Sequence, residues 1–393
     1  MNIRLQNQDG YGTIHSEVKA MEYTYKTVII GAGPAGAACG IILQKSGELP
    51  CIIDKATFPR HKTCAGLVTD KTYQLIQTIF DSSDVGGLFC DSADRVALFQ
   101  GTKPLASSEI ERPVYFVNRS SFDNALVARY KNLGGKLIEG EKDITIDYEK
   151  KTIRLSGGDE IHYRYLLFAD GALSMSRRML ETKKEDFAIG IEAYVPADRI
   201  KVDSVALYFG YLDDGYIWVF PHGDRVCIGA GESYHKDNRR CREALLRFMK
   251  DVGVDPEGIR FIGAFIPYGA PPDQKKLPEN ILLLGDAAGL TDPISGEGLY
   301  MAMRSGVFAA QALTTPQPKK DYLCRISLMQ KTARDGAKVR SLFYTPAFHQ
   351  KILKKINGNS RAVGFYFDNM VNHYRYTYRN ILRLYGDYKK SRK

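Results

Sequence analysis

A glycine-rich turn near the N-terminus constrains the fold more than any other feature of the sequence. The segment "TVIIGAGPAGAACGIIL" places an apolar strand directly ahead of a G-x-G-x-x-G run, and small residues continue into a helix. Gly31 permits a tight turn, Gly33 lets backbone approach a pyrophosphate, and Gly36 lets the helix pack closely on the strand. A second strand, "CIID", ends at Asp54, 23 residues after Gly31, where a carboxylate accepts hydrogen bonds from a ribose. The spacing predicts an α/β protein with a Rossmann-like dinucleotide-binding domain.

Three later segments favour FAD as the dinucleotide. "YLLFADGALS" is a buried strand ending at Asp170, "NILLLGDAAG" is another ending at Asp286, and "VNRSSFDNAL" puts Arg119 next to the start of a helix. Ligands bind at the carboxyl ends of parallel strands, so Asp286 can hold the ribityl chain. A helix beginning near Gly296–Leu299 can direct backbone N–H groups at the flavin pyrimidine and stabilise the charge of reduced flavin. These segments predict non-covalently bound FAD.

These segments, scattered over residues 27–300, resemble those of the large flavoprotein class with the p-hydroxybenzoate hydroxylase fold. The resemblance implies a discontinuous FAD-binding domain, roofed by a second, mostly antiparallel β-sheet that carries the substrate. We expect a polar N-terminal extension at 1–21, the FAD-binding domain at 22–90, 114–185 and 276–315, the substrate-side sheet domain at 91–113 and 186–275, and a basic helical C-terminal region at 316–393.

Two further motifs narrow the resemblance to one branch of that class. "YIWVFPHGDRVCIGAG" fits the pattern Y-x-W-x-F-P, seven residues, G-x-G, and "FPRHKTCAG" follows the second strand. Together with "IPYGAP" at 266–271 they resemble the geranylgeranyl reductase family, whose members saturate isoprenoid double bonds. The family usually has C-G-G where this chain has Cys64-Ala65-Gly66. Ala65 adds a methyl group beside the expected flavin edge and could mark a different substrate.

The aromatic residues of the longer motif alternate along one strand. Side chains alternate across a strand, so Tyr216, Trp218 and Phe220 point to the same face. By pattern alone, such a face more often belongs to a core. The family resemblance implies instead that the three rings line an apolar slot over the flavin, sized for a polyprenyl chain.

Cys64 also has two interpretations. A single cysteine is usually a small buried hydrophobe. Cationic neighbours such as Arg60 and Lys62 make a thiol more reactive, and the resemblance places Cys64 beside the flavin. A proton donor or a substrate contact is the functional interpretation, and packing is the structural one.

The predicted site therefore contains three sets of residues. The catalytic set is Cys64, Tyr216 and Trp218, and the substrate-binding set is Tyr216, Trp218 and Phe220. The cofactor-binding set is Gly31, Gly33, Ala35, Gly36, Asp54, Lys55, Arg60, Ala65, Gly66, Arg119, Asp170, Asp286, Gly296, Gly298 and Leu299. The seven histidines form no ligand cluster, and we predict no metal site.

The sequence favours a reductase in which reduced flavin N5 delivers hydride to an alkene and a nearby acid supplies the proton. The alternative is a monooxygenase or halogenase of the same fold, although the halogenase W-x-W-x-I-P pattern is absent because the chain has one tryptophan.

An electron-transfer flavoprotein would carry a C-terminal cysteine cluster, whereas the last cysteine here is Cys324. A prenyl-binding carrier would not need the FAD motifs. No second glycine-rich loop marks a donor site, so NAD(P)H, ferredoxin and reduced free flavin all stay open as electron donors.

Charge and cysteine content bear on partners and location. Seven scattered cysteines without C-x-x-C spacing suit a reducing cytosol, and the polar first 21 residues have no signal-peptide core. Residues 351–393 hold eleven Lys and Arg against two Asp, or +9 of the net +10, so the rest of the chain is nearly neutral and nucleic acid is not an expected partner. The expected substrate is a prenyl lipid or prenyl diphosphate.

The basic C-terminal region also shows an apolar helical face. The face contains Phe367, Met370, Val371, Tyr374, Tyr378, Ile381, Leu382 and Tyr385, and Arg375, Arg379 and Arg383 flank it. Such a helix either docks on its own domain or lies on an anionic membrane surface, and the density of basic residues favours the membrane. The sequence thus predicts a cytoplasmic protein with peripheral membrane contact.

Overall fold

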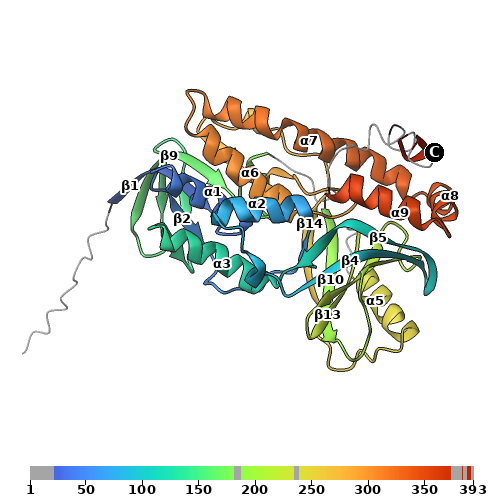
Figure 1. Ribbon diagram of the computed structural model, residues 1–393. Coiled ribbons are helices and arrows are strands. Elements are labelled where there is room, and N and C mark those ends of the chain that lie inside the picture. The colour runs from blue at the N-terminus through green and yellow to red at the C-terminus, as the bar shows by residue number, and fades with distance from the viewer. Residues whose placement is uncertain (1–21, 181–186, 234–238, 373–382, 384–386, 391–393) are drawn as a thin grey trace, which may run out of the picture.

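The computed structural model describes residues 22–180, 187–233, 239–372, 383 and 387–390. The chain is a mixed α/β protein built around two β-sheets, as the sequence predicts (Figure 1). The first sheet runs in the order β6-β2-β1-β9-β8-β7, and a further strand, β15, pairs with β9. Its strands are β1 (Glu22–Ile30), β2 (Cys51–Asp54), β6 (Lys136–Glu139), β7 (Thr145–Asp147), β8 (Thr152–Arg154), β9 (Glu160–Phe168) and β15 (Ile281–Leu283).

The first sheet is parallel at its centre, where β1 lies between β2 and β9. Helix α1 (Pro34–Lys45) packs against α6 (Leu299–Ala312) through small residues. A Cβ at Gly306 of α6 would lie 2.2 Å from the carbonyl oxygen of Ala35 on α1, so only glycine allows this approach. The close packing brings the start of α6 to the same end of the sheet as the start of α1.

The second sheet has eight strands in the order β14-β10-β13-β12-β11-β4-β5-β3 and is antiparallel apart from the β4–β11 pair. Its strands are β3 (Leu67–Val68), β4 (Asp91–Gln100), β5 (Lys103–Phe116), β10 (Phe187–Pro196), β11 (Val205–Phe209), β12 (Tyr216–His222), β13 (Arg225–Ser233) and β14 (Ile262–Pro267). Within the predicted domain limits, β3 and the last residues of β5 fall in the FAD-binding range, although they pair within this sheet.

Helices cover both sheets. They are α2 (Asp70–Phe80), α3 (Arg119–Asn132), α4 (Ser176–Met179), α5 (Arg239–Asp251), α7 (Pro318–Phe343), α8 (Pro346–Ile356) and α9 (Ser360–Phe367), and short 3₁₀ turns lie at Gly86–Leu88, Gln274–Lys276 and Gly285–Ala288. Helix α5 packs on one face of the second sheet, where Leu245 and Phe248 join a buried apolar cluster with Ile189. Figure 1 shows α7 running along α6, with α8 and α9 beside β5.

The predicted apolar face of the C-terminal region is only partly described. A π-helical turn, Asp368–Asn372, follows α9, and most of the residues predicted to form that face lie outside the described part of the chain. Phe367 packs with the cluster that contains Val363 and Phe220, and the Asp368 carboxylate accepts a hydrogen bond from the Glu111 backbone. The start of the predicted face therefore docks on the protein itself. Within the described residues, none of the helices has both the length and the apolarity needed to cross a membrane.

Candidate active site

The turn between β1 and α1 has the geometry that the glycine pattern predicts. Gly31 has φ +104°, and a Cβ there would lie 2.5 Å from the carbonyl oxygen of Ala169, just past the end of β9. A Cβ at Gly36 would lie 1.9 Å from the carbonyl oxygen of Gly31. Gly33 is the N-cap of α1, so the first N–H groups of the helix are open to a phosphate. These three positions form a cradle that side chains would fill.

The carboxylate of Asp54 at the end of β2 braces this turn. Its Oδ2 accepts from Ala32 N at 2.6 Å, and its Oδ1 accepts from Ala56 N at 2.8 Å. A carboxylate has about four lone-pair sites, so it can also accept from ribose hydroxyls. Beyond the end of β9, on the other side of β1, Asp170 Oδ2 accepts from Met175 N, and burial raises the pKa of Asp170. The exposed Lys55 follows β2.

A buried carboxylate holds two of the predicted cofactor-binding arginines. Asp123 is fully buried and accepts from Arg119 Nε at 2.8 Å and from Arg119 Nη2 at 3.0 Å. Arg60 Nη2 lies 3.2 Å from the same carboxylate, and a Cβ at Gly33 would lie 3.4 Å from this nitrogen. Two cations against one anion leave a net positive charge beside the phosphate turn, which fits a diphosphate.

Cys64 lies between this arginine pair and the second sheet. Burial lowers the pKa of Arg119, but Asp123 and the Cys64 thiol raise it more strongly, so the guanidinium stays charged. The backbone N–H of Cys64 donates to Glu192 Oε1 at 2.9 Å, across to β10. Gly66 follows with φ +70°, and a Cβ there would lie 2.2 Å from the Val117 carbonyl oxygen. The segment is thus fixed at both ends of the C-A-G motif.

Ala65 is joined to the aromatic strand. Its carbonyl oxygen lies 2.9 Å from His222 Nε2, at the end of β12. His222 Nδ1 lies 3.4 Å from the Cys90 thiol. Burial lowers the pKa of His222, so the ring is neutral near pH 7 and donates to only one of these partners.

The register of three adjacent strands explains the aromatic motif. Tyr216 and Trp218 of β12 lie opposite Gly231 and Gly229 of β13. The next strand, β10, places Gly190 and Glu192 opposite those same glycines. A Cβ at Gly229 would lie 2.1 Å from Trp218 Cζ2, so the indole lies over the glycine. Large rings on one strand therefore face a strip without side chains on the next.

The three predicted rings have different surroundings. Phe220 is 5% exposed and stacks at a tilt on Phe116 at 5.5 Å, so it belongs to the core. Trp218 and Tyr216 stay partly exposed, with ring centroids 6.2 Å apart in an edge contact. The Tyr216 hydroxyl donates to the Ser295 carbonyl at 2.6 Å. Tyr216 and Trp218 therefore form the aromatic wall beside the loop that precedes α6.

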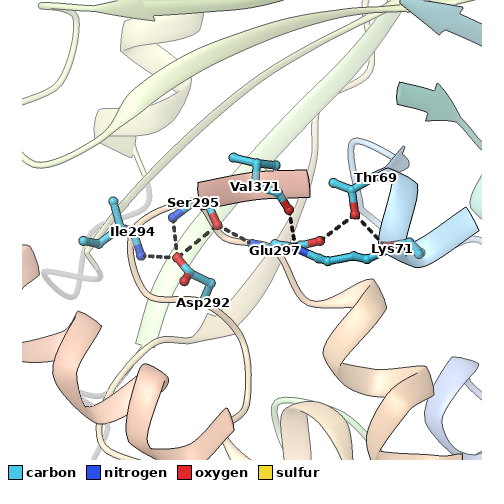
Figure 2. A network of polar contacts seen from close by, with 8 residues as sticks. Thr69, Lys71, Asp292, Ile294, Ser295, Glu297 and Val371 are labelled. Carbon is cyan, nitrogen blue, oxygen red and sulfur yellow. Dashed lines mark hydrogen bonds and ion pairs between the residues drawn. The ribbon is translucent and has the colours of Figure 1, made fainter. Parts of the chain in front are cut away.

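That loop, residues 292–298, leads into the N-terminus of α6 and is tied down from several sides (Figure 2). The Asp292 carboxylate accepts from Ile294 N at 3.0 Å and from Ser295 N at 2.8 Å. Glu297 accepts from Lys71 Nζ at 2.8 Å, and Lys71 also donates to the Val371 carbonyl. Lys71 thus links the C-terminal region to the loop that is expected to face the flavin.

The remaining predicted cofactor residues gather around the start of α6. Gly298 is the N-cap, and Leu299 is the first helical residue. A Cβ at Gly298 would lie 3.5 Å from Asp286 Oδ1, which accepts from the Thr291 hydroxyl at 2.8 Å. Gly296 has φ +73°, and a Cβ there would lie 4.0 Å from the Tyr216 hydroxyl oxygen. Asp286 and the α6 N-terminus therefore lie together, as a ribityl and pyrimidine site requires.

A family model described as pyridine nucleotide-disulphide oxidoreductase matches residues 25–231, more than half of the chain. The chain belongs to this family of flavoproteins. An uncharacterised protein of Methanosarcina barkeri is 31% identical over 81% of this chain and 82% of its own length. A digeranylgeranylglycerophospholipid reductase of Methanococcus aeolicus is 25% identical over 86% of this chain and 88% of its own length.

A solved structure shares the fold of this flavoprotein. A geranylgeranyl bacteriochlorophyll reductase-like protein of Thermoplasma acidophilum superposes with a TM-score of 0.72 at 18% identity, over 85% of this chain and 92% of that one. The relatives and the fold confirm the predicted resemblance to geranylgeranyl reductases, and with the family match they indicate an oxidoreductase with FAD as its cofactor. The phosphate cradle, the arginine pair and the α6 N-terminus all fit that cofactor.

Sequence reasoning missed several residues of this flavoprotein's site. Asp123 lies four residues after Arg119, a spacing that indicates an ion pair on a helix. Glu192 is the single charge in the strand "FAIGIEAYVP", and an isolated charge in an apolar strand marks a buried polar role. No local signal marks Arg340 of α7, which reaches Pro293 and Asp214 from far along the chain. In the described part of the chain, His, Cys, Asp and Glu side chains form no group of three or more that could hold a metal.

Proposed function

We propose that this flavoprotein saturates isoprenoid double bonds of a prenyl lipid, a geranylgeranyl-type reduction. Bound FAD, once reduced, supplies hydride to the alkene. The chain itself must hold a long apolar substrate against the flavin, exclude water and place a proton donor. The name of the Methanococcus aeolicus relative supports this reaction class.

One observation carries the proposal. Trp218 and Tyr216 lie opposite Gly229 and Gly231, the Trp218 indole covers both glycines, and the same sheet face reaches Ser295 through the Tyr216 hydroxyl. An aromatic wall above a strip without side chains leaves a flat, apolar surface next to the expected pyrimidine site. A polyprenyl chain is itself flat and apolar at each double bond, so burial against this wall favours its binding.

Cys64 is the proposed proton donor. It is partly exposed, lies between Arg119 and Glu192, and sits on the segment that His222 ties to the aromatic strand. An isolated alkene accepts hydride poorly, so protonation of the second carbon must accompany hydride delivery. The Arg119 guanidinium also contacts the Cys64 side chain.

Mass spectrometry of prenyl lipids tests the proposal directly. Lipids incubated with the reduced protein should gain two hydrogens for each double bond saturated, and the Asp286→Ala variant, which should lose FAD, serves as the control. Hydroxylated or halogenated products with oxygen uptake would assign the chain to the monooxygenase alternative. Unchanged prenyl lipids, diphosphates and quinone tails with FAD-loaded protein would refute the reduction.

We propose further that the basic C-terminal region brings the protein to an anionic membrane surface, where such a lipid resides. Lys351, Lys354 and Lys355 of α8 and Arg361 of α9 are exposed. Each Lys or Arg near an anionic surface contributes roughly 1 kcal/mol. Together these cations would give reversible, salt-sensitive binding without a membrane span.

A further inference from the structure

Glu192 is a buried acid that the proposed reaction does not yet use. It lies on β10, in the interior of the second sheet, and is 1% exposed. Gly229 of β13 lies opposite both Glu192 and Trp218. The Glu192 side chain therefore points to the same face of the sheet as the Trp218 side chain. A charged residue rarely occupies such a position unless it has a partner.

The partner of Glu192 is the backbone of Cys64. Glu192 Oε1 accepts the Cys64 N–H at 2.9 Å, and Oε2 lies 4.0 Å from the Cys227 thiol. A hydrogen bond to an ionised carboxylate is stronger than one to a neutral carboxyl group. The strength of this contact therefore depends on whether Glu192 carries its charge.

We propose that Glu192 is a positioning residue for Cys64: the carboxylate fixes the Cys64–Gly66 segment against the second sheet, and protonation of the carboxyl group loosens it. The proposal concerns the placement of the thiol, and it depends on the proposed function only for its effect on turnover. The Glu192 carboxylate accepts from the Cys64 N–H and lies beside the Cys227 thiol, so it acts on the reaction only through Cys64.

The surroundings of Glu192 allow its carboxyl group to gain or lose its proton near neutral pH. Burial raises its pKa to about 7, while the Cys64 N–H, Arg119 and Lys62 oppose the rise. Two further titratable groups face it, Cys227 from β13 and Tyr194 from its own strand, and burial raises the pKa of both. Both therefore stay neutral as Glu192 titrates, so the change in charge falls on the carboxyl group.

The reactivity of Cys64 tests the proposal without any prenyl substrate. FAD-loaded protein is alkylated with iodoacetamide from pH 5.5 to 8.5, and each cysteine is followed by peptide mass spectrometry. The exposed Cys324 serves as the internal reference. The alkylation rate of Cys64 is divided by that of Cys324 in each protein. As the pH rises through 7, this ratio should become roughly fivefold lower in the wild type than in Glu192→Gln, because only the wild type gains the carboxylate contact.

Glu232→Gln is the matched control. Glu232 is equally buried on β13 but pairs with Arg240 and contacts Cys241 of α5, on the opposite face of the sheet. This control should follow the wild-type curve for Cys64. Superimposable curves for wild type and Glu192→Gln, or an equal change in Glu232→Gln, would overturn the proposal.

Hydrogen exchange of the wild type keeps the proposal falsifiable if Glu192→Gln does not fold. After correction for the intrinsic rate, the peptide containing the Cys64 amide should be about fivefold better protected at pH 8 than at pH 6. Equal protection at both pH values would refute the positioning role. Neither experiment uses a prenyl lipid, so a failure of lipid reduction leaves both results interpretable.

Discussion

Trp218 of β12 lies directly opposite Gly229 of β13, and its indole occupies the space that a side chain at position 229 would need. The seven residues between the two halves of the Y-x-W-x-F-P…G-x-G motif are the length that the β12–β13 hairpin needs to create this register. The same register sets Tyr216 against Gly231. The motif thus encodes a packing relationship in which the single indole fits over two glycines, Gly229 and Gly231.

Gly229→Ala should displace the indole, because the new Cβ would lie 2.1 Å from Trp218 Cζ2. Overpacking of this kind typically costs about 1–3 kcal/mol of the free energy of unfolding. Trp218 is the chain's single tryptophan, so its fluorescence reports the displacement directly. Gly157→Ala is the control, since a Cβ there meets no atom within 4 Å. Unchanged emission and stability in Gly229→Ala would contradict the proposed contact.

Trp218→Ala should weaken prenyl binding while flavin stays bound, because the aromatic wall loses its largest ring. Replacing a fully buried tryptophan by alanine typically lowers the free energy of unfolding by about 3–5 kcal/mol. Replacing the partly exposed Trp218 should lower it by less. Prenyl affinity and FAD content are measured on folded protein. Lower stability with unchanged affinity would place Trp218 in the core alone.

Cys64→Ser should slow prenyl reduction and leave flavin reduction by dithionite unchanged, because serine keeps the size of the side chain and loses its acidity. Single-turnover kinetics with pre-reduced protein separate the two steps. Equal turnover in both proteins would make Cys64 a packing residue.

Asp123→Asn should destabilise the protein and weaken FAD binding together. The change leaves Arg119 buried without its anion, and breaking a buried pair typically costs about 3–5 kcal/mol. Arg60 loses the same carboxylate. Asp213→Asn removes an exposed ion pair with Arg240 and should change neither quantity appreciably. Urea unfolding and FAD titration measure both effects, and wild-type FAD affinity in Asp123→Asn would separate the arginine pair from the cofactor site.

The stability of Glu192→Gln relative to the wild type should rise with pH. Burial raises the pKa of Glu192 from 4.5 to about 7, so the folded protein binds this proton more tightly than the unfolded chain. Its contribution is fully present below about pH 4.5, declines as the pH rises, and is lost above about pH 7. The shift in pKa corresponds to a change of about 3 kcal/mol at most in the free energy of unfolding. Urea midpoints at pH 5 and 8 measure it, and a constant difference between the two proteins would exclude this titration.

The wild type should sediment with anionic liposomes at low salt and leave them at high salt. Replacing three cations of the C-terminal region by glutamine should weaken sedimentation without changing flavin content: Arg375, Arg379 and Arg383. The charge-matched control replaces exposed lysines ahead of β7 and in the β7–β8 turn: Lys142, Lys150 and Lys151. Equal effects of both triple variants would mean that net charge alone drives the binding. If the wild type does not sediment even at low salt, the result would favour the alternative that the C-terminal region docks on its own domain.

The parts of the site that follow from local sequence could be predicted. The glycine turn and the start of α6 at Leu299 depend on residues that are neighbours in the chain, and Asp54 lies 22 residues from its partner Ala32, at the end of the strand that follows α1. Glu192 and Cys64 are 128 residues apart, and only the pairing of the sheets joins them. The placement of Phe220 in the core also depends on a distant partner, Phe116. Tertiary contacts of this kind leave no spacing that a single sequence reveals.

Arg340 of α7 joins three segments that are otherwise separate. Its guanidinium donates to the Pro293 carbonyl at 2.7 Å, to the Asp214 carbonyl at 2.6 Å and to the Ser233 hydroxyl at 3.3 Å. Tyr268 and Tyr344 lie under the same cation. A nascent chain cannot complete this set until residues 214, 233 and 293 have been assembled and α7 has been synthesised. The junction between the second sheet and the loop that precedes α6 is therefore finished last, from the C-terminal end, and a protein truncated before α7 would lack the side chain that joins them.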